Sequence, residues 1–221
     1  DSCFFERKNE YFPFAQKSDF RKDVLSLNKI IPGKAYQFGR PDEHHIYLFH
    51  ADKKMQNKKL DNTLEILMYD MGGKARDCFQ TPNLTVEEIR QQTGVDRILP
   101  DYSIDDYSFS PVGYSLNAVK GSLYYTIHVT PQQDSPYVSF ETNQASREDV
   151  RGVINAVLET FQPRSFDIMF FEPTAKEEII DLAGYKKRSA VCAELFNGLS
   201  VQYGHYAKPI YEIQDPVELK F

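Results

Sequence analysis

Cysteine is scarce in this sequence of 221 residues, and the few cysteines present are widely separated. Only Cys3, Cys78 and Cys192 occur, an odd number with no Cys-x-x-Cys pair. Disulfide-stabilised secreted domains and cysteine-rich zinc sites both need more cysteines at closer spacing. The pattern therefore argues against both, and we expect a protein of a reducing compartment, the cytoplasm.

The sequence also lacks an excess of positive charge and any long apolar run. The formal net charge is −6, and the short lysine run between residues 53 and 59 lies beside acidic residues. No apolar run approaches the roughly 18 residues of a membrane span, and the first residues show no signal-peptide pattern. We expect neither nucleic acid nor a membrane as a partner.

The composition that remains is that of a folded protein, with 41% hydrophobic and 26% charged residues. Helical periodicity with capping residues predicts four helices: one opening at Ser18 or Asp19, one from Thr85 to Gly94, one from Ser146 to just before Pro163, and one from Thr174 to Gly184. The glycine-containing segments 39–45 and 71–77 are interpreted as turns.

Runs rich in β-branched and aromatic residues alternate with these helices and predict strands. They cover residues 34–39, 44–50, 63–69, 123–130, 137–142, 166–171, 200–207 and 209–213. Several follow one another through short turns, which favours antiparallel neighbours. The expected fold class is α+β, with antiparallel sheet and helices packed outside.

Three of these strands carry an ionisable group midway along one face: Glu65, His128 and Glu141. A carboxylate at a half-buried position must be hydrogen-bonded, paired with a cation or held at a raised pKa. Two interpretations stay open. Glu65 and Glu141 either face solvent on an open sheet, or they line an internal acidic cavity for a small cation.

Ser115 and His128 also have two interpretations, as a turn serine with an ordinary strand histidine or as a nucleophile and its base. The surrounding GYSLN segment is not the Gly-x-Ser-x-Gly turn of hydrolases, so a hydrolase is disfavoured. His44 and His50 are expected on one strand face and His45 on the other. No acidic or cysteine partner for them is evident, so no metal site is predicted.

Four segments in order, TLEILMYD, PVGYSLNAV, YTIHVTP and YVSFETN, closely resemble the eukaryotic S-adenosylmethionine decarboxylases, the pyruvoyl enzymes of polyamine synthesis. The resemblance extends from about Phe4 and weakens after Gly184. It implies a four-layer αββα sandwich of two antiparallel sheets with helices on the outer faces.

The resemblance also implies roles for individual residues. Ser115 and His128 would assist self-cleavage of a proenzyme, with the histidine as base, and Phe109 would stack on the substrate's adenine. A buried site for putrescine, which activates some members, would be lined by Asp61, Thr63, Glu65, Glu141 and Phe171. A diamine would supply the positive charge that the buried carboxylates require.

The implied reaction is decarboxylation of S-adenosylmethionine through a Schiff base with a pyruvoyl carbonyl, which acts as the electron sink. The product would supply aminopropyl groups for spermidine and spermine. Expected partners are S-adenosylmethionine, putrescine and the N-terminal chain released by self-cleavage, and a homodimer is a possible assembly. No metal cofactor is implied.

Two departures from the family pattern bear on activity. The family forms its pyruvoyl group from a Glu-Ser-Ser motif, and this sequence has no Glu-Ser dipeptide. We therefore expect residues 1–221 to be a single decarboxylase domain that lacks its N-terminal part. Gln132 replaces a glutamate that binds the ribose hydroxyls, and a neutral amide bonds less strongly than a carboxylate. The alternatives are a non-catalytic regulatory relative that binds an active decarboxylase, and a putrescine-binding module.

Overall fold

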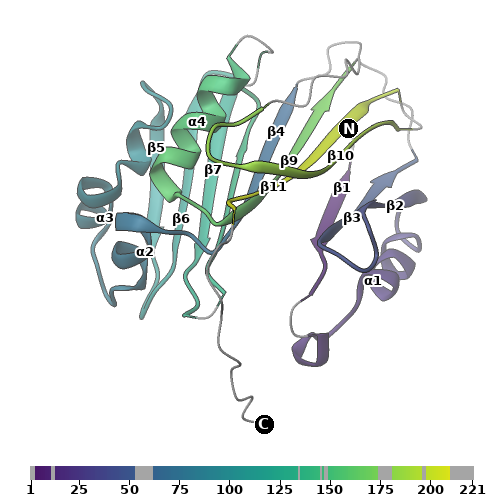
Figure 1. Cartoon of the computed structure of the whole chain (residues 1–221), viewed down its shortest axis with the longest axis horizontal. Coiled ribbons are helices and arrows are strands. Elements are labelled where there is room, and N and C mark those ends of the chain that lie inside the picture. Colours follow the sequence, from purple (N-terminus) through teal and green to yellow (C-terminus); the bar gives the residue numbers. More distant parts are fainter. Residues whose placement is uncertain are drawn as a thin grey trace.

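The computed structural model forms two antiparallel β-sheets that face one another, with helices outside (Figure 1). The structure describes residues 3–10, 13–52, 62–133, 135–144, 146, 149–173, 181–195 and 198–209. No helix in these ranges is both long enough and apolar enough to span a membrane.

The large sheet has eight strands in the order β10-β11-β9-β4-β8-β7-β6-β5. Its strands are β4 (Thr63–Tyr69), β5 (Ser103–Ser108), β6 (Tyr114–Lys120), β7 (Leu123–Thr130), β8 (Tyr137–Thr142), β9 (Ser165–Glu172), β10 (Lys186–Glu194) and β11 (Ser200–Ala207). The small sheet has the order β1-β3-β2 and consists of β1 (Phe4–Lys8), β2 (Gly33–Gly39) and β3 (His45–Ala51).

The helices lie on the outer side of each sheet. On the large sheet these are α2 (Gly73–Gln80), α3 (Val86–Thr93) and α4 (Val150–Phe161), whereas α1 (Phe20–Leu27) lies beyond the small sheet (Figure 1). Short 3₁₀ turns occur at Pro13–Ala15 and Val95–Arg97. The expected α+β fold with a four-layer αββα arrangement is confirmed.

Alternation along the strands of the large sheet produces two apolar cores. The outer face packs against the helices, and buried residues such as Leu64 and Ile66 of β4 meet Ile154 and Val157 of α4 there. The inner face packs against the small sheet through a second cluster: Phe38, Ile46, Leu48, Met169, Phe171, Leu195, Leu199, Val201 and Tyr203. Side chains of both sheets therefore line the space between them, and the strand register determines which side chains these are.

One predicted helix start is confirmed in detail. The Thr85 hydroxyl accepts the Glu88 N–H while the Glu88 carboxylate accepts the Thr85 N–H, and the helix ends at Gly94 with φ 73°. The start predicted at Ser146 is less exact, because Ser146 Oγ accepts the Asp149 N–H at 3.2 Å but α4 begins at Val150 and ends at Phe161. Reciprocal bonds of this kind satisfy the backbone donors that a helix start leaves unpaired.

Two sequence expectations about helices are wrong. Segment 71–77 is not simply a turn, because α2 begins at Gly73 and buries Ala75, Cys78 and Phe79 against the outer core. Tertiary burial outweighs the low helix propensity of its glycines. The helix expected to open at Ser18 or Asp19 does begin after Asp19, which caps it, but it ends at Leu27 and buries no residue, so it does not cover a core.

Four strands escaped the sequence pattern: β1, β5, β6 and β10. β5 and β10 are the two edges of the large sheet, where exposed and charged residues alternate with few apolar ones. Most of the helix expected at 174–184 and of the strand expected at 209–213 lies outside the described residues.

Replacing Ile154 of α4 by alanine should lower the free energy of unfolding by about 2–5 kcal/mol, because this side chain is fully buried in the outer core and its loss leaves a cavity. Ile30→Ala is the matched control, since Ile30 is 84% exposed. Urea denaturation of both variants measures the difference. Equal effects would contradict the assigned core.

Candidate functional site

Ser115 and His128 lie side by side on the inner face of the large sheet. They are direct partners in the register of β6 and β7, and Ser115 Oγ is 2.9 Å from His128 Nδ1. When this nitrogen is unprotonated, the serine hydroxyl can donate its proton to it. Ser115 is therefore a strand residue rather than a turn residue, and the pair has the contact that proton transfer requires.

An aromatic platform lies next to this pair. Tyr107 of β5 pairs with Ser115 in the sheet, and its ring meets that of Phe109 edge to face at 4.9 Å. Phe109 is 47% exposed, so its ring is available to a ligand. Gly113 permits this turn, because its φ is +128° and an added Cβ would lie 3.3 Å from the Phe109 Cβ. Sequence reasoning missed Tyr107, since β5 gave no strand pattern.

The carboxylates of Glu65 and Glu141 lie directly opposite one another across β4 and β8. Thr63, two residues from Glu65 on the same face, pairs with Phe171 of β9. The structure thus brings together four of the five residues predicted for a putrescine site, and Asp61 lies outside the described residues. Like charges directly opposite in a sheet repel, so this arrangement is costly without a proton or a cation.

A third carboxylate, Glu6 of β1, enters the same space from the small sheet. Both its carboxylate oxygens are buried, and neither has a partner at hydrogen-bonding geometry among the described residues, although Glu65 lies close enough to influence its pKa. Burial, and then the charge of Glu65, raises the pKa of Glu6 well above its ordinary value. Sequence reasoning missed Glu6 because FFERK gave no sign of a strand that faces β4.

Glu65 shows the same effect. Burial is the largest cause that raises the pKa of Glu65 to about 7, the nearby Glu6 carboxyl group works against it, and the charge of Glu141 adds to it. Glu141 accepts a hydrogen bond from the Tyr124 hydroxyl. Three carboxyl groups therefore lie together between the two sheets, and the pKa values of Glu6 and Glu65 are raised. Glu65 and Glu141 are half-buried rather than exposed on an open sheet. We call the group of Glu6, Glu65 and Glu141 the acidic cavity, and cation binding there stays a prediction.

Gln132 lies two residues beyond β7 and is exposed, with its backbone N–H bonded to the Thr130 carbonyl oxygen at 3.0 Å. β7 is also the strand that carries His128. The structure records no contact between its side chain and Ser115, His128 or Phe109.

A sequence profile of the adenosylmethionine decarboxylase family matches residues 1–207. The chain belongs to this family. It is 32% identical to the S-adenosylmethionine decarboxylase proenzyme of Drosophila melanogaster over 93% of this chain and 68% of the relative. The proenzyme of Dictyostelium discoideum is also 32% identical, over 92% of this chain and 51% of the relative. The chain thus spans about half to two thirds of the length of these decarboxylase relatives.

A solved structure shows the same fold. The Trypanosoma brucei AdoMetDC-delta26 monomer superposes with a TM-score of 0.70 at 25% identity, over 95% of this chain and 85% of that one. The family uses a pyruvoyl cofactor and binds S-adenosylmethionine. In this family setting, the Ser115–His128 pair, the aromatic platform and the acidic cavity occupy one continuous inner face of the large sheet.

The structure also gives His44 an acidic partner that the sequence did not reveal. His44 and His50 share a face of β3 toward the large sheet, as expected, and His44 Nε2 lies 2.6 Å from Asp167 Oδ2. His205 Nδ1 lies 2.8 Å from Asp167 Oδ1. Burial alone would raise the pKa of Asp167, but hydrogen bonds from the two histidines outweigh it and hold that pKa below its usual value.

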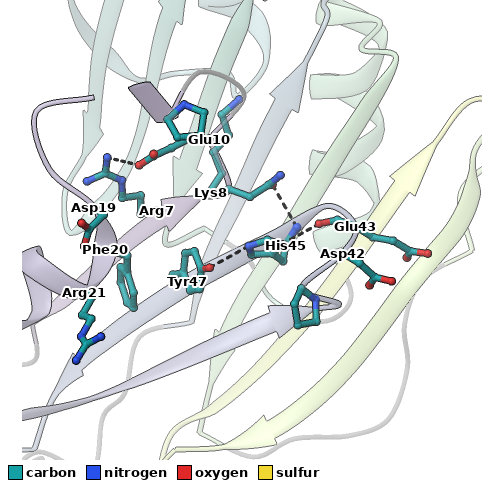
Figure 2. Close-up of a pocket in the computed structure, with 13 residues that line it drawn as sticks. Arg7, Lys8, Glu10, Asp19, Phe20, Arg21, Asp42, Glu43, His45 and Tyr47 are labelled. Carbon is teal, nitrogen blue, oxygen red and sulfur yellow. Dashed lines mark hydrogen bonds and ion pairs between the residues drawn. The ribbon is translucent and has the colours of Figure 1, made fainter. Parts of the chain in front are cut away.

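A separate surface pocket of about 580 Å³ lies on the outer side of the small sheet, next to α1 (Figure 2). Two of its lining groups interact as drawn, since Arg7 pairs with Glu10 and the His45 ring bonds to Tyr47 (Figure 2). Arg7 also pairs with Asp23, which does not line the pocket. None of the predicted site residues lines it. It is therefore not part of the candidate decarboxylase site.

Stability should depend on pH through the acidic cavity. Because the pKa of Glu65 is higher in the folded protein than in the unfolded chain, the folded state binds this proton more tightly. The stabilisation that Glu65 contributes is fully present below about pH 4.5 and is lost as the pH rises through about 7. The resulting decrease in the free energy of unfolding is at most about 3 kcal/mol.

Chemical denaturation between pH 4.5 and 8 measures this dependence. Glu65→Gln should flatten most of the decline, whereas Glu159→Gln, an exposed control on α4, should leave it unchanged. Identical pH profiles for the two variants would show that Glu65 is not the titrating group.

Proposed function

We propose that this chain carries the substrate-binding and activator-binding part of an S-adenosylmethionine decarboxylase of spermidine and spermine synthesis. The observation that supports this best is the hydrogen-bonded Ser115–His128 pair on the inner face of the sheet, beside the exposed ring of Phe109. A hydroxyl, a base and an aromatic surface within adjacent strands match the roles that the family resemblance assigns.

The residues on the inner face would have separate roles in substrate binding and self-cleavage. Phe109 would stack on the adenine of S-adenosylmethionine, with Tyr107 supporting its ring. Gln132 would accept hydrogen bonds from the ribose hydroxyls. His128 would act as the base in self-cleavage, with Ser115 holding its ring through the 2.9 Å contact.

The pyruvoyl group would act as the electron sink for loss of carbon dioxide. Ser115 and His128 fit its chemistry, because a hydroxyl hydrogen-bonded to an imidazole can give up or take up a proton. The sequence contains no Glu-Ser dipeptide, so we propose that residues outside the printed sequence supply the group. The chain would then be the larger part of one decarboxylase domain.

The acidic cavity would bind putrescine. Glu65 and Glu141 face one another from β4 and β8, Glu6 approaches from the small sheet, and Thr63 and Phe171 complete the wall. A diamine brings two positive charges and the hydrogen-bond donors that the Glu6 oxygens lack. Its binding would remove the repulsion between the facing carboxylates.

A second candidate function is a non-catalytic relative that regulates an active decarboxylase. Gln132 favours it, because a neutral amide at the ribose position forms weaker hydrogen bonds than a carboxylate. Such a relative would keep the acidic cavity and lose the need for Ser115 and His128.

His128→Ala should abolish self-cleavage, because general-base assistance contributes about 10²–10⁴-fold to a rate. The test is denaturing intact-mass analysis of the protein expressed from its complete natural reading frame, with carbon dioxide release from carboxyl-labelled S-adenosylmethionine as second readout. His128 is exposed on its strand, so the melting temperature should not change.

The result separates the two candidates. A wild-type protein that is cleaved and active, with an uncleaved or ester-stalled His128→Ala variant, fits the decarboxylase. Normal cleavage in His128→Ala would refute the role of His128, and an uncleaved, inactive wild-type protein would favour the regulatory relative.

Glu65→Gln and Glu141→Gln should each weaken putrescine binding about 10-fold to 100-fold, since each removes one charge-assisted contact from a buried site. Isothermal titration calorimetry measures the affinity, with Glu159→Gln as the matched surface control. Wild-type protein that does not bind putrescine, or variants that bind it as well as the control, would exclude the diamine site.

A further inference from the structure

Three potential metal ligands meet between the two sheets, on strands distant from the Ser115–His128 pair. His44 immediately precedes β3 of the small sheet, whereas Asp167 and His205 are direct partners on β9 and β11 of the large sheet. One donor atom from each lies within 4.8 Å of the others, and this is the sole group of its kind among the described residues.

The donor atoms lie close to one another. His44 Nε2 faces Asp167 Oδ2 at 2.6 Å, His205 Nδ1 faces Asp167 Oδ1 at 2.8 Å, and the two imidazole rings stack with centroids 4.3 Å apart. Zinc bonds to imidazole nitrogen and carboxylate oxygen are about 2.0–2.2 Å long. Small ring movements would therefore bring both nitrogens and the carboxylate within bonding distance of a single ion.

The carboxylate is held in place by other groups, independently of the histidines. The Tyr69 hydroxyl donates to Asp167 Oδ2 at 2.6 Å, and the Tyr203 hydroxyl donates to Oδ1 at 3.2 Å. Hydrogen bonds to ligating carboxylates are a regular feature of metal sites, where they fix the orientation of the ligand. The two tyrosines would therefore keep Asp167 oriented when the imidazole nitrogens bind an ion.

Charge and access both suit a cation. Asp167 is fully buried, while the side chains of His44 and His205 are 15% and 11% exposed, which leaves an edge for entry. Lys8 lies near, its amine 4.6 Å from the Tyr69 ring centroid, and its positive charge opposes a second cation. The carboxylate of Asp167 lies near enough to interact with Lys8 and offsets that charge.

We propose that His44, Asp167 and His205 form a binding site for a divalent metal ion of the zinc class. Two imidazole nitrogens with a carboxylate suit zinc, and cobalt occupies the same ligand sets. Since His44 belongs to the small sheet and the other two ligands belong to the large one, the ion would tie the two sheets together. This role is separate from decarboxylation.

The experiment is a titration of chelator-treated protein with zinc chloride, followed by isothermal calorimetry and thermal unfolding, and with cobalt chloride, followed by visible absorption. We expect one ion per chain, a raised melting temperature and a cobalt spectrum of a nitrogen-ligated site. His44→Gln and His205→Gln should each weaken binding at least about 10-fold to 100-fold.

His45→Gln is the matched control, because its ring bonds to Tyr47 on the other face of the same strand and should leave binding unchanged. If the wild-type protein shows no saturable binding and no cobalt spectrum, the group is a metal-free hydrogen-bonded network and the proposal fails. It also fails if His44→Gln binds as tightly as His45→Gln. The wild-type measurements decide this even if a variant does not fold.

Discussion

Unbalanced negative charge between the two sheets is the constraint on which the candidate site depends. Glu65 and Glu141 face one another from the large sheet, and Glu6 adds a third carboxyl group from the small one. A buried charge of one sign costs several kcal/mol unless it is protonated or paired. The protein without ligand relies on protons, as the raised pKa values of Glu6 and Glu65 show, and cation binding would exchange those protons for fixed positive charge.

Strand register is what converts scattered residues into this arrangement. Ser115 and His128 are thirteen residues apart in the sequence, yet they are direct partners in β6 and β7, and Glu65 and Glu141 become partners through β4 and β8. A slip of one residue in either pair would turn these side chains toward the outer core, where Ile127 and Phe140 now lie. The apolar packing under α4 therefore also fixes the geometry of the polar face.

Alternation in the sequence was enough to predict the polar face of the large sheet. Glu65, His128 and Glu141 stood out because each interrupts a strongly apolar strand, and the structure places all three on the inner face. Glu6 and Asp167 could not be found in this way. Asp167 lies in a strand whose residues are nearly all buried, so alternation gives no contrast, and Glu6 lies in a short strand of mixed composition.

Contacts between side chains of different sheets also could not be predicted from the sequence. The two histidines at 44 and 205 meet only because the small sheet packs on β9 and β11, and no local pattern encodes that packing. The helix at Gly73–Gln80 was missed for a related reason, since burial of Phe79 against the outer core outweighs the glycines at its start.

The sandwich therefore has two regions between its sheets that favour positive charge, one at Glu6, Glu65 and Glu141 and one at Asp167. If a diamine binds at the first region, the carboxyl groups that are protonated in the free protein must ionise.

The most direct test is the number of protons released when putrescine binds at pH 6. Calorimetric titrations in buffers of different ionisation enthalpy measure this number. We expect release of about one proton or more per diamine bound, because Glu65, whose pKa is raised to about 7, is largely protonated at this pH, and the pKa of Glu6 is raised as well. Binding without proton release, or with proton uptake, would contradict the claim that the diamine replaces protons on these carboxyl groups.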